Sequence, residues 1–165
     1  MTMGYLRTAI SVGATAVLAV SGAVVATTTA QAAPARTQGL EQCLSALMKP
    51  VGRGWAVQVP GGWEDASTTC NLKYGDMPRR YGPDYVGDPA SAIKALQRNL
   101  NYCYGSKLVV DGKYGSKTRA AVQNVQRRHK VTVDGIYGPK TRSAMNWRLY
   151  SLHKHAWSKT CSSPI

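Results

Sequence analysis

A twelve-residue segment occurs twice in the C-terminal half of the chain, and it constrains the fold more than any other feature of the sequence. Residues 110–121 read VDGKYGSKTRAA and residues 133–144 read VDGIYGPKTRSA, so nine of the twelve positions are identical. This identity exceeds what shared turn chemistry would give, and it indicates one structural unit used twice. Asp111 and Asp134 each precede a glycine and are expected to accept hydrogen bonds from backbone N–H groups, as turn residues do.

Three short helices are predicted around these turns. The first begins after a candidate N-cap, Asp88, and carries an apolar stripe at helical spacing. The stripe consists of Ile93, Leu96 and Leu100. The second helix follows Ser116, and the third covers residues 140–150, where Met145 and Leu149 lie four positions apart. The predicted fold class is therefore mainly α: a compact three-helix bundle preceded by an irregular, disulfide-linked N-terminal region.

The N-terminus carries the three-part pattern of a secretory signal peptide. Arg7 is followed by an apolar run over residues 9–26 and then by Ala30-Gln31-Ala32, a small-residue cleavage motif. Glycine, serine and threonine keep the run weakly apolar, which favours a cleaved signal over the alternative, a membrane anchor. We expect cleavage after Ala32 and a secreted protein that is extracellular or associated with the cell wall.

The predicted signal peptide comprises residues 1–32, and the chain after it divides into three predicted regions. Residues 33–87 are rich in Gly, Pro and Tyr and are expected to be irregular, although residues 40–48 fit a short helix and residues 60–62 a hairpin turn. Residues 88–150 hold the helices and the repeat. Residues 151–165 form a C-terminal tail that contains the last cysteine.

Four cysteines in an exported chain indicate two disulfide bonds. They are Cys43, Cys70, Cys103 and Cys161. If the segment after Cys70 runs back along the first helix, which is about 20 Å long, Cys70 lies near the helix end that carries Cys103. This reasoning favours Cys70 with Cys103 and Cys43 with Cys161. The alternative joins Cys43 to Cys70 and Cys103 to Cys161.

The net charge of +13 is concentrated in one half of the chain. Residues 33–88 carry six basic and six acidic groups, whereas residues 89–165 carry fourteen basic groups and two acidic ones. Such a segment attracts polyanions. An exported protein meets anionic wall polymers first, and the arginines form no nucleic-acid-binding motif, so we expect no nucleic-acid partner.

Residues suited to catalysis are scarce. Glutamate occurs only at positions 41 and 64, and Glu64 with Asp65 forms a pair of sequence neighbours, not two carboxylates placed across a sugar. His153 and His155 have a lysine between them and no acidic residue after them, which makes a poor metal site. A Gly-x-Ser-x-Gly nucleophile motif is absent from the sequence. We therefore expect no enzymatic activity, no metal and no cofactor.

Residues 92–100, AIKALQRNL, together with the two Asp-Gly-x-Tyr-Gly-x-x-Thr units, resemble the peptidoglycan-binding domain family, a three-helix module often appended to wall hydrolases. The resemblance covers residues 88 to about 150. It implies non-covalent attachment to peptidoglycan through a shallow site along the first helix and the two turns. The chain departs from the family at Lys130, where the family favours glycine at a position suited to left-handed backbone.

The resemblance implies eight ligand-binding residues on this surface. They are Gln97, Asn101, Tyr114, Lys117, Arg119, Tyr137, Lys140 and Arg142. Aromatic faces and hydrogen-bonding side chains suit sugar and peptide ligands. The alternative is that the tyrosines close the core. The basic residues fall in first turns of helices, where the macrodipole disfavours cations, and either an anionic ligand or simple duplication of the repeat explains this.

The sequence thus predicts a secreted, non-catalytic protein that binds peptidoglycan or an associated anionic wall polymer, with no membrane partner after signal cleavage. A second interpretation belongs to another class of protein: a secreted, disulfide-stapled interaction module that recognises a protein or an anionic wall polymer rather than peptidoglycan. Binding to purified insoluble peptidoglycan distinguishes the two.

Overall fold

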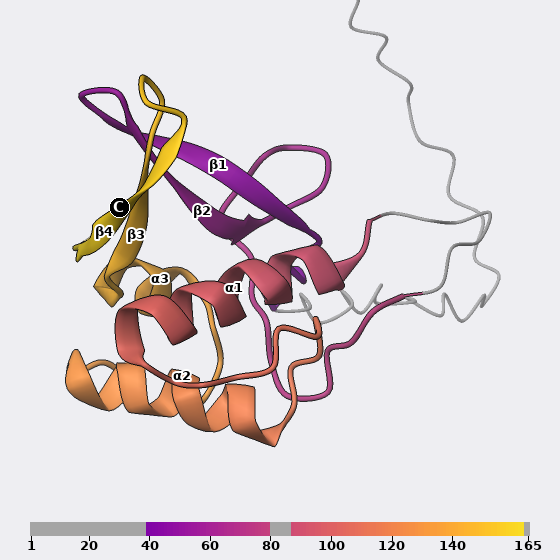
Figure 1. The fold of residues 1–165 in the computed structure, drawn as a ribbon. Helices are drawn as coiled ribbons and strands as arrows, with labels where there is room; N and C mark the ends of the chain where they lie inside the picture. Colours follow the sequence, from indigo (N-terminus) through magenta and orange to yellow (C-terminus); the bar gives the residue numbers. More distant parts are fainter. Residues whose placement is uncertain (1–38, 80–86, 164–165) are drawn as a thin grey trace, which may run out of the picture. The chain divides into compact units, whose positions relative to one another are not determined.

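The computed structural model describes residues 39–79 and 87–163, and the predicted signal peptide lies outside the described residues. The elements follow the chain in the order β1 (Ser45–Gly52), β2 (Trp55–Gly61), α1 (Pro89–Tyr104), α2 (Ser116–Arg128), α3 (Pro139–Ala144), β3 (Trp147–Ser151) and β4 (Ala156–Ser162) (Figure 1). Within this part of the chain, no helix has the length and apolar character needed to cross a membrane.

An antiparallel sheet of four strands, in the order β1-β2-β3-β4, accompanies the three helices. The β1–β2 hairpin turns between Gly52 and Trp55, and β2 joins β3 through pairs such as Ala56 with Tyr150. Strands from the two ends of the chain therefore meet in one sheet. The predicted mainly α fold class is wrong, because residues that were expected to be irregular, helical or a tail form this sheet.

The prediction failed where strand formation depends on distant partners. The third helix ends at Ala144 because the backbone of Met145 is extended, with ψ of 150°. Trp147 and Leu149 then lie on the same face of β3, where Trp147 is in the core and Leu149 packs against it. Residues 45–48 belong to β1 rather than to a helix, and the hairpin turn precedes β2 instead of following it at residues 60–62.

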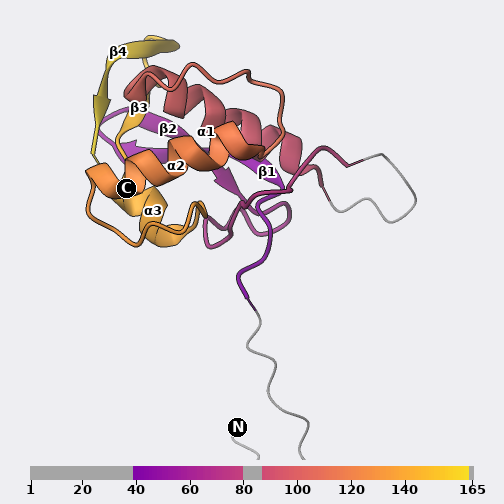
Figure 2. The same cartoon turned by 90° about the horizontal axis from the view of Figure 1, so that it is seen from below.

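Helix α1 lies between the sheet and α2 (Figures 1 and 2). It begins as predicted, because Asp88 Oδ1 accepts a hydrogen bond from the Ala90 N–H at 2.8 Å and Pro89 occupies the first turn. The predicted stripe of Ile93, Leu96 and Leu100 is fully buried. It shares one core with Val57 and Val59 of β2 and with Trp147 of β3. The helix therefore positions side chains on two faces, one against the sheet and one against the repeat.

An extended segment after β2 connects the sheet region to both repeated tyrosines. Leu72 exchanges two backbone hydrogen bonds with Tyr137, at N···O distances of 2.8 and 2.9 Å. The Tyr114 N–H donates to the Asp76 carbonyl at 2.7 Å. Residues 70–76 are thus built into the same compact unit as the repeat, which spans residues 37–165.

The disulfide bonds join Cys43 to Cys70 and Cys103 to Cys161. Two disulfides were predicted correctly, but the favoured pairing is wrong and the alternative is right. The segment after Cys70 does not run back along α1, because Asn71 pairs with Gln42 and the next residue pairs with the second repeated tyrosine. Cys103 lies in the last turn of α1, where it is bonded to β4.

Candidate functional site

The first Asp-Gly turn is held by a buried glutamine from α1. Gln97 Nε2 donates to Asp111 Oδ1 at 2.9 Å and to the Lys113 carbonyl at 3.0 Å, and its Oε1 accepts the Gly112 N–H at 3.0 Å. Thr118 Oγ1 lies 3.3 Å from the same Nε2. The Gln97 side chain is 1 % exposed. This predicted ligand-binding residue therefore uses its amide to fix the turn.

The second turn is held in the same way by Gln126 of α2. Its Nε2 donates to Asp134 Oδ1 at 2.7 Å and to the Ile136 carbonyl at 3.0 Å, and its Oε1 accepts the Gly135 N–H at 2.9 Å. Thr141 Oγ1 completes the set at 3.0 Å. Sequence reasoning missed Gln126, although a Gln-Arg pair precedes both turns. The two networks match atom for atom.

The aspartates and glycines of the turns have the local roles that the sequence predicts. The hydrogen bond from Gln97, and then the one that Asp111 Oδ1 accepts from the Lys113 N–H at 2.9 Å, hold the pKa of Asp111 below its usual value. Gly112 has φ of 78°, and a Cβ there would lie 3.0 Å from the Cβ of Ala90. Glycine is therefore needed for both the backbone conformation and the approach to α1.

Both repeated tyrosines are buried. Tyr114 donates its hydroxyl to the Gly135 carbonyl at 3.0 Å, and Tyr137 meets Trp147 edge to face with ring centroids 6.3 Å apart. Burial raises the pKa of each tyrosine above its usual range. Both phenols are neutral at physiological pH, and neither ring presents a face at the surface, so in this structure they close the core as the alternative interpretation holds.

The predicted basic residues lie in the first turns of α2 and α3. Lys117, Arg119 and Lys140 are exposed, and Arg119 borders a shallow hollow of about 500 Å³ next to Tyr74. Arg142 is half-buried and donates to the carbonyl of Thr68. The first three are free to meet a ligand, whereas Arg142 also anchors the loop after β2.

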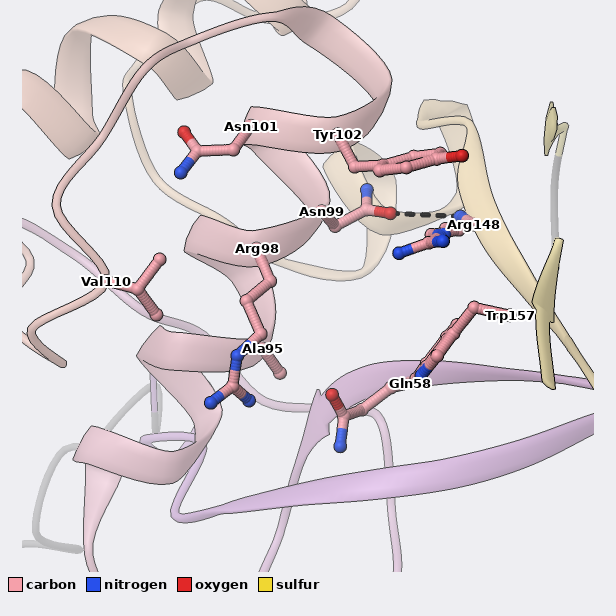
Figure 3. A pocket seen from close by; sticks show the side chains of 9 residues that line it. All are labelled: Gln58, Ala95, Arg98, Asn99, Asn101, Tyr102, Val110, Arg148 and Trp157. Atoms are coloured by element: carbon pink, nitrogen blue, oxygen red, sulfur yellow. Dashed lines mark hydrogen bonds between the residues drawn. The ribbon is translucent and has the colours of Figure 1, made fainter. Parts of the chain in front are cut away.

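A cleft of about 640 Å³ opens between α1 and the sheet (Figure 3). Its lining comes from four elements and a loop: Gln58, Ala95, Arg98, Asn99, Asn101, Tyr102, Val110, Arg148 and Trp157. Of the eight predicted ligand-binding residues, Asn101 lines this cleft, while its amide holds the loop after α1 through Leu108 at 2.6 and 2.8 Å. The other seven lie elsewhere.

Arg148 of β3 is held in a fixed orientation on the sheet side of this cleft. Its guanidinium carbon lies 3.7 Å from the ring centroid of Tyr102 and 5.6 Å from that of Trp157. Its Nε donates to the Ser158 carbonyl at 2.9 Å, and the Tyr102 hydroxyl donates to the same oxygen at 3.1 Å. Figure 3 shows Arg148 and Gln58 reaching from the sheet, and Arg98 from α1, toward the space between them. The arrangement suits a ligand that carries a negative charge and also has an apolar surface that can pack against the aromatic rings.

Comparison with known families assigns the helical part of the chain. Residues 89–145 match the family model described as "Putative peptidoglycan binding domain". The matched segment comprises α1, α2, α3 and both Asp-Gly turns, and it falls within the region for which the sequence predicts such a domain. No curated protein matches the chain.

Two solved structures are similar to parts of the chain. One is a Burkholderia AP3 phage endolysin, with 40 % identity, a TM-score of 0.34, and coverage of 44 % of this chain and 23 % of that one. The other is a peptidoglycan-binding protein from Clostridioides difficile in complex with glutamine hydroxamate, with 26 % identity, a TM-score of 0.39, and coverage of 59 % and 53 %. The matched parts are thus about a quarter and a half of those chains.

The cleft extends beyond the segment that matches the family model. Gln58, Arg148 and Trp157 lie outside residues 89–145 and come from three different strands. Sequence reasoning missed them because no local pattern connects these positions; the available signal was the clustering of aromatic and basic residues after residue 146. The sheet therefore adds one wall to a cleft whose other wall is α1 of the domain.

In residues 39–79 and 87–163, no three His, Cys, Asp or Glu side chains gather closely enough to hold a metal ion. His153 and His155 are exposed in the turn between β3 and β4.

Proposed function

We propose that this chain is a secreted, non-catalytic protein that binds peptidoglycan in the cell wall. The observation that carries the proposal is the match of residues 89–145 to the peptidoglycan-binding family. The two disulfide bonds support a location outside the reducing cytoplasm. In this account the domain attaches the chain to the wall, and the sheet is a stabilising and ligand-contacting addition.

The lining of the cleft supports a binding role without chemistry. Its nine residues are apolar, aromatic, amide-bearing or basic, and they include no carboxylate and no nucleophile with a neighbouring base. Glu64 and Asp65 are exposed in a loop after β2 and adjoin each other in sequence. We therefore expect the purified protein to release no soluble fragments from peptidoglycan.

Binding to an anionic wall polymer is a second candidate function, and the charge of the C-terminal half favours it. Residues 89–165 carry fourteen basic and two acidic groups, and Lys117, Arg119 and Lys140 are exposed. Attraction of this kind is screened over about 8 Å at physiological ionic strength. Contacts in the cleft that depend on stacking and hydrogen bonds should persist in salt.

Co-sedimentation of the chain without residues 1–32 tests the proposal. Two preparations of insoluble peptidoglycan are compared, one with its teichoic polymers and one stripped of them, each over a range of salt concentrations, with insoluble cellulose as the control. We expect binding to the stripped material that survives high salt. Binding that is lost on stripping would show that the protein recognises the polyanion and not peptidoglycan.

A further inference from the structure

We propose that the cleft between α1 and the sheet binds the free carboxylate at the end of a wall peptide, with Arg98 and Arg148 as the residues that hold it. The inference rests on the proposed function, because it names the part of the wall that the protein recognises. It places the ligand at a site built jointly by the peptidoglycan-binding domain and by strands outside it.

The charge of the cleft is the first argument. Arg98 and Arg148 both line it, and none of its other seven residues is acidic. Two arginines that line one concave surface create a positive potential that favours an anion. The lining thus favours a negatively charged group over a neutral sugar.

The fixed orientation of Arg148 is the second argument. Tyr102 stacks on the guanidinium at 3.7 Å, and Nε is held by the Ser158 carbonyl at 2.9 Å. The two Nη groups have no hydrogen-bond partner among the described residues and remain available to a ligand. Two parallel N–H donors in one plane match the two oxygens of a carboxylate. Little side-chain entropy is lost on binding, because the guanidinium is already ordered.

The rest of the lining suits a short peptide. Gln58 offers an amide that can exchange hydrogen bonds with a peptide backbone, and Ala95 and Val110 form a small apolar wall. Trp157 is 39 % exposed and closes the cleft on the side of β4. A volume of about 640 Å³ lies within the range of small-molecule sites. A short peptide that ends in a carboxylate and carries small side chains can contact each of these groups.

Calorimetric titration with diacetyl-L-Lys-D-Ala-D-Ala and with its C-terminal amide tests the inference. We expect the acid to bind and the amide to bind at least about tenfold more weakly, as for loss of one charge-assisted interaction. Arg98→Gln and Arg148→Gln should each weaken binding of the acid about tenfold, whereas Arg127→Gln, an exposed position on α2 outside the cleft, should leave it unchanged.

Three results would overturn the assignment: equal binding of acid and amide, no binding of the acid, or equal displacement of the peptide by inorganic phosphate. Arg98 is exposed on α1, so Arg98→Gln keeps the test valid if Arg148→Gln fails to fold. Wild-type sedimentation with stripped peptidoglycan, combined with equal acid and amide binding, would leave the proposed function standing and reject the carboxylate site. Failure of the wild type to sediment would reject the proposed function itself.

Discussion

Single residues in the repeat have contacts that differ between its copies, and the tyrosines show this most clearly. The Tyr114 hydroxyl donates to the Gly135 carbonyl, whereas the Tyr137 hydroxyl is buried without a hydrogen-bond partner in the described part of the chain. A buried polar group without a partner costs about 1–3 kcal/mol. Tyr137→Phe should therefore raise the free energy of unfolding by about 1 kcal/mol, and Tyr114→Phe should lower it by about 1–2 kcal/mol. Urea denaturation compares them, and equal destabilisation would contradict the assigned contacts.

Lys130 provides a second test at this scale. The resemblance places Lys130 where glycine is favoured, and its φ is 54°. Backbone bonds from Val131 N–H to Gln126 and from Lys130 N–H to Arg127 close the end of α2 in a Schellman motif. Gly105, also with positive φ, ends α1 in an αL motif, in which its N–H donates to the Asn101 carbonyl. Lys130→Gly should raise the free energy of unfolding by about 0.5–1 kcal/mol, since it removes the strained Cβ. Gly105→Ala is the matched control and should lower it; a loss of stability in Lys130→Gly would contradict this account.

His129 links stability to pH. Tyr104 accepts the Asn146 N–H at 2.6 Å, and its hydroxyl lies 2.9 Å from His129 Nε2, where it can donate its own proton to a neutral imidazole. Burial and then the charge of Arg128 lower the pKa of His129 below 6.5. The unfolded chain thus binds the proton more readily, and stability should fall as pH drops from about 6.5 through the folded pKa. Melting temperatures between pH 7.5 and pH 5 measure this. His129→Gln should flatten the profile, and an unchanged profile would refute the link.

At the scale of elements, the two disulfides connect different parts of the fold. Cys103–Cys161 ties α1 to β4, the strand that carries Trp157, whereas Cys43–Cys70 lies at the start of β1 and does not line the cleft. Replacing either pair by alanine should cost about 2–4 kcal/mol of unfolding free energy. The Cys103/Cys161 variant should also bind the acid peptide more weakly, because β4 is released. Retained affinity in that variant, measured by calorimetry, would show that β4 is not part of the site.

Elements set by neighbours in the sequence were predictable, and those set by distant partners were not. Asp88 begins α1 through a bond to a residue two positions away, and Asp111 forms its turn in the same way. Strand β3 instead depends on β2, where Ala56 meets Tyr150. Residues 147–150, which were expected to continue the third helix, therefore form a strand. The cleft was missed for the same reason, because Gln58, Arg148 and Trp157 meet only after the two ends of the chain join in one sheet.

At the scale of the whole molecule, the sheet adds a second wall to the segment that matches the peptidoglycan-binding family. Residues 89–145 supply α1, and the flanking strands pack on its buried stripe beside Arg98 and Tyr102, which stay exposed. The domain and the sheet share a core that includes Leu96 and Val59, so they form one unit rather than a domain with an appendage.

Mapping of the contact surface by two-dimensional ¹H–¹⁵N NMR, with soluble muropeptides added to the chain without residues 1–32, tests the central claim most directly. The account predicts that the largest shifts cluster on the indole of Trp157 and the backbones of Arg98, Tyr102 and Arg148, and that they saturate with added ligand. It is contradicted if the spectrum does not change, or if the shifts are confined to residues around Lys117 and Lys140 in the first turns of α2 and α3.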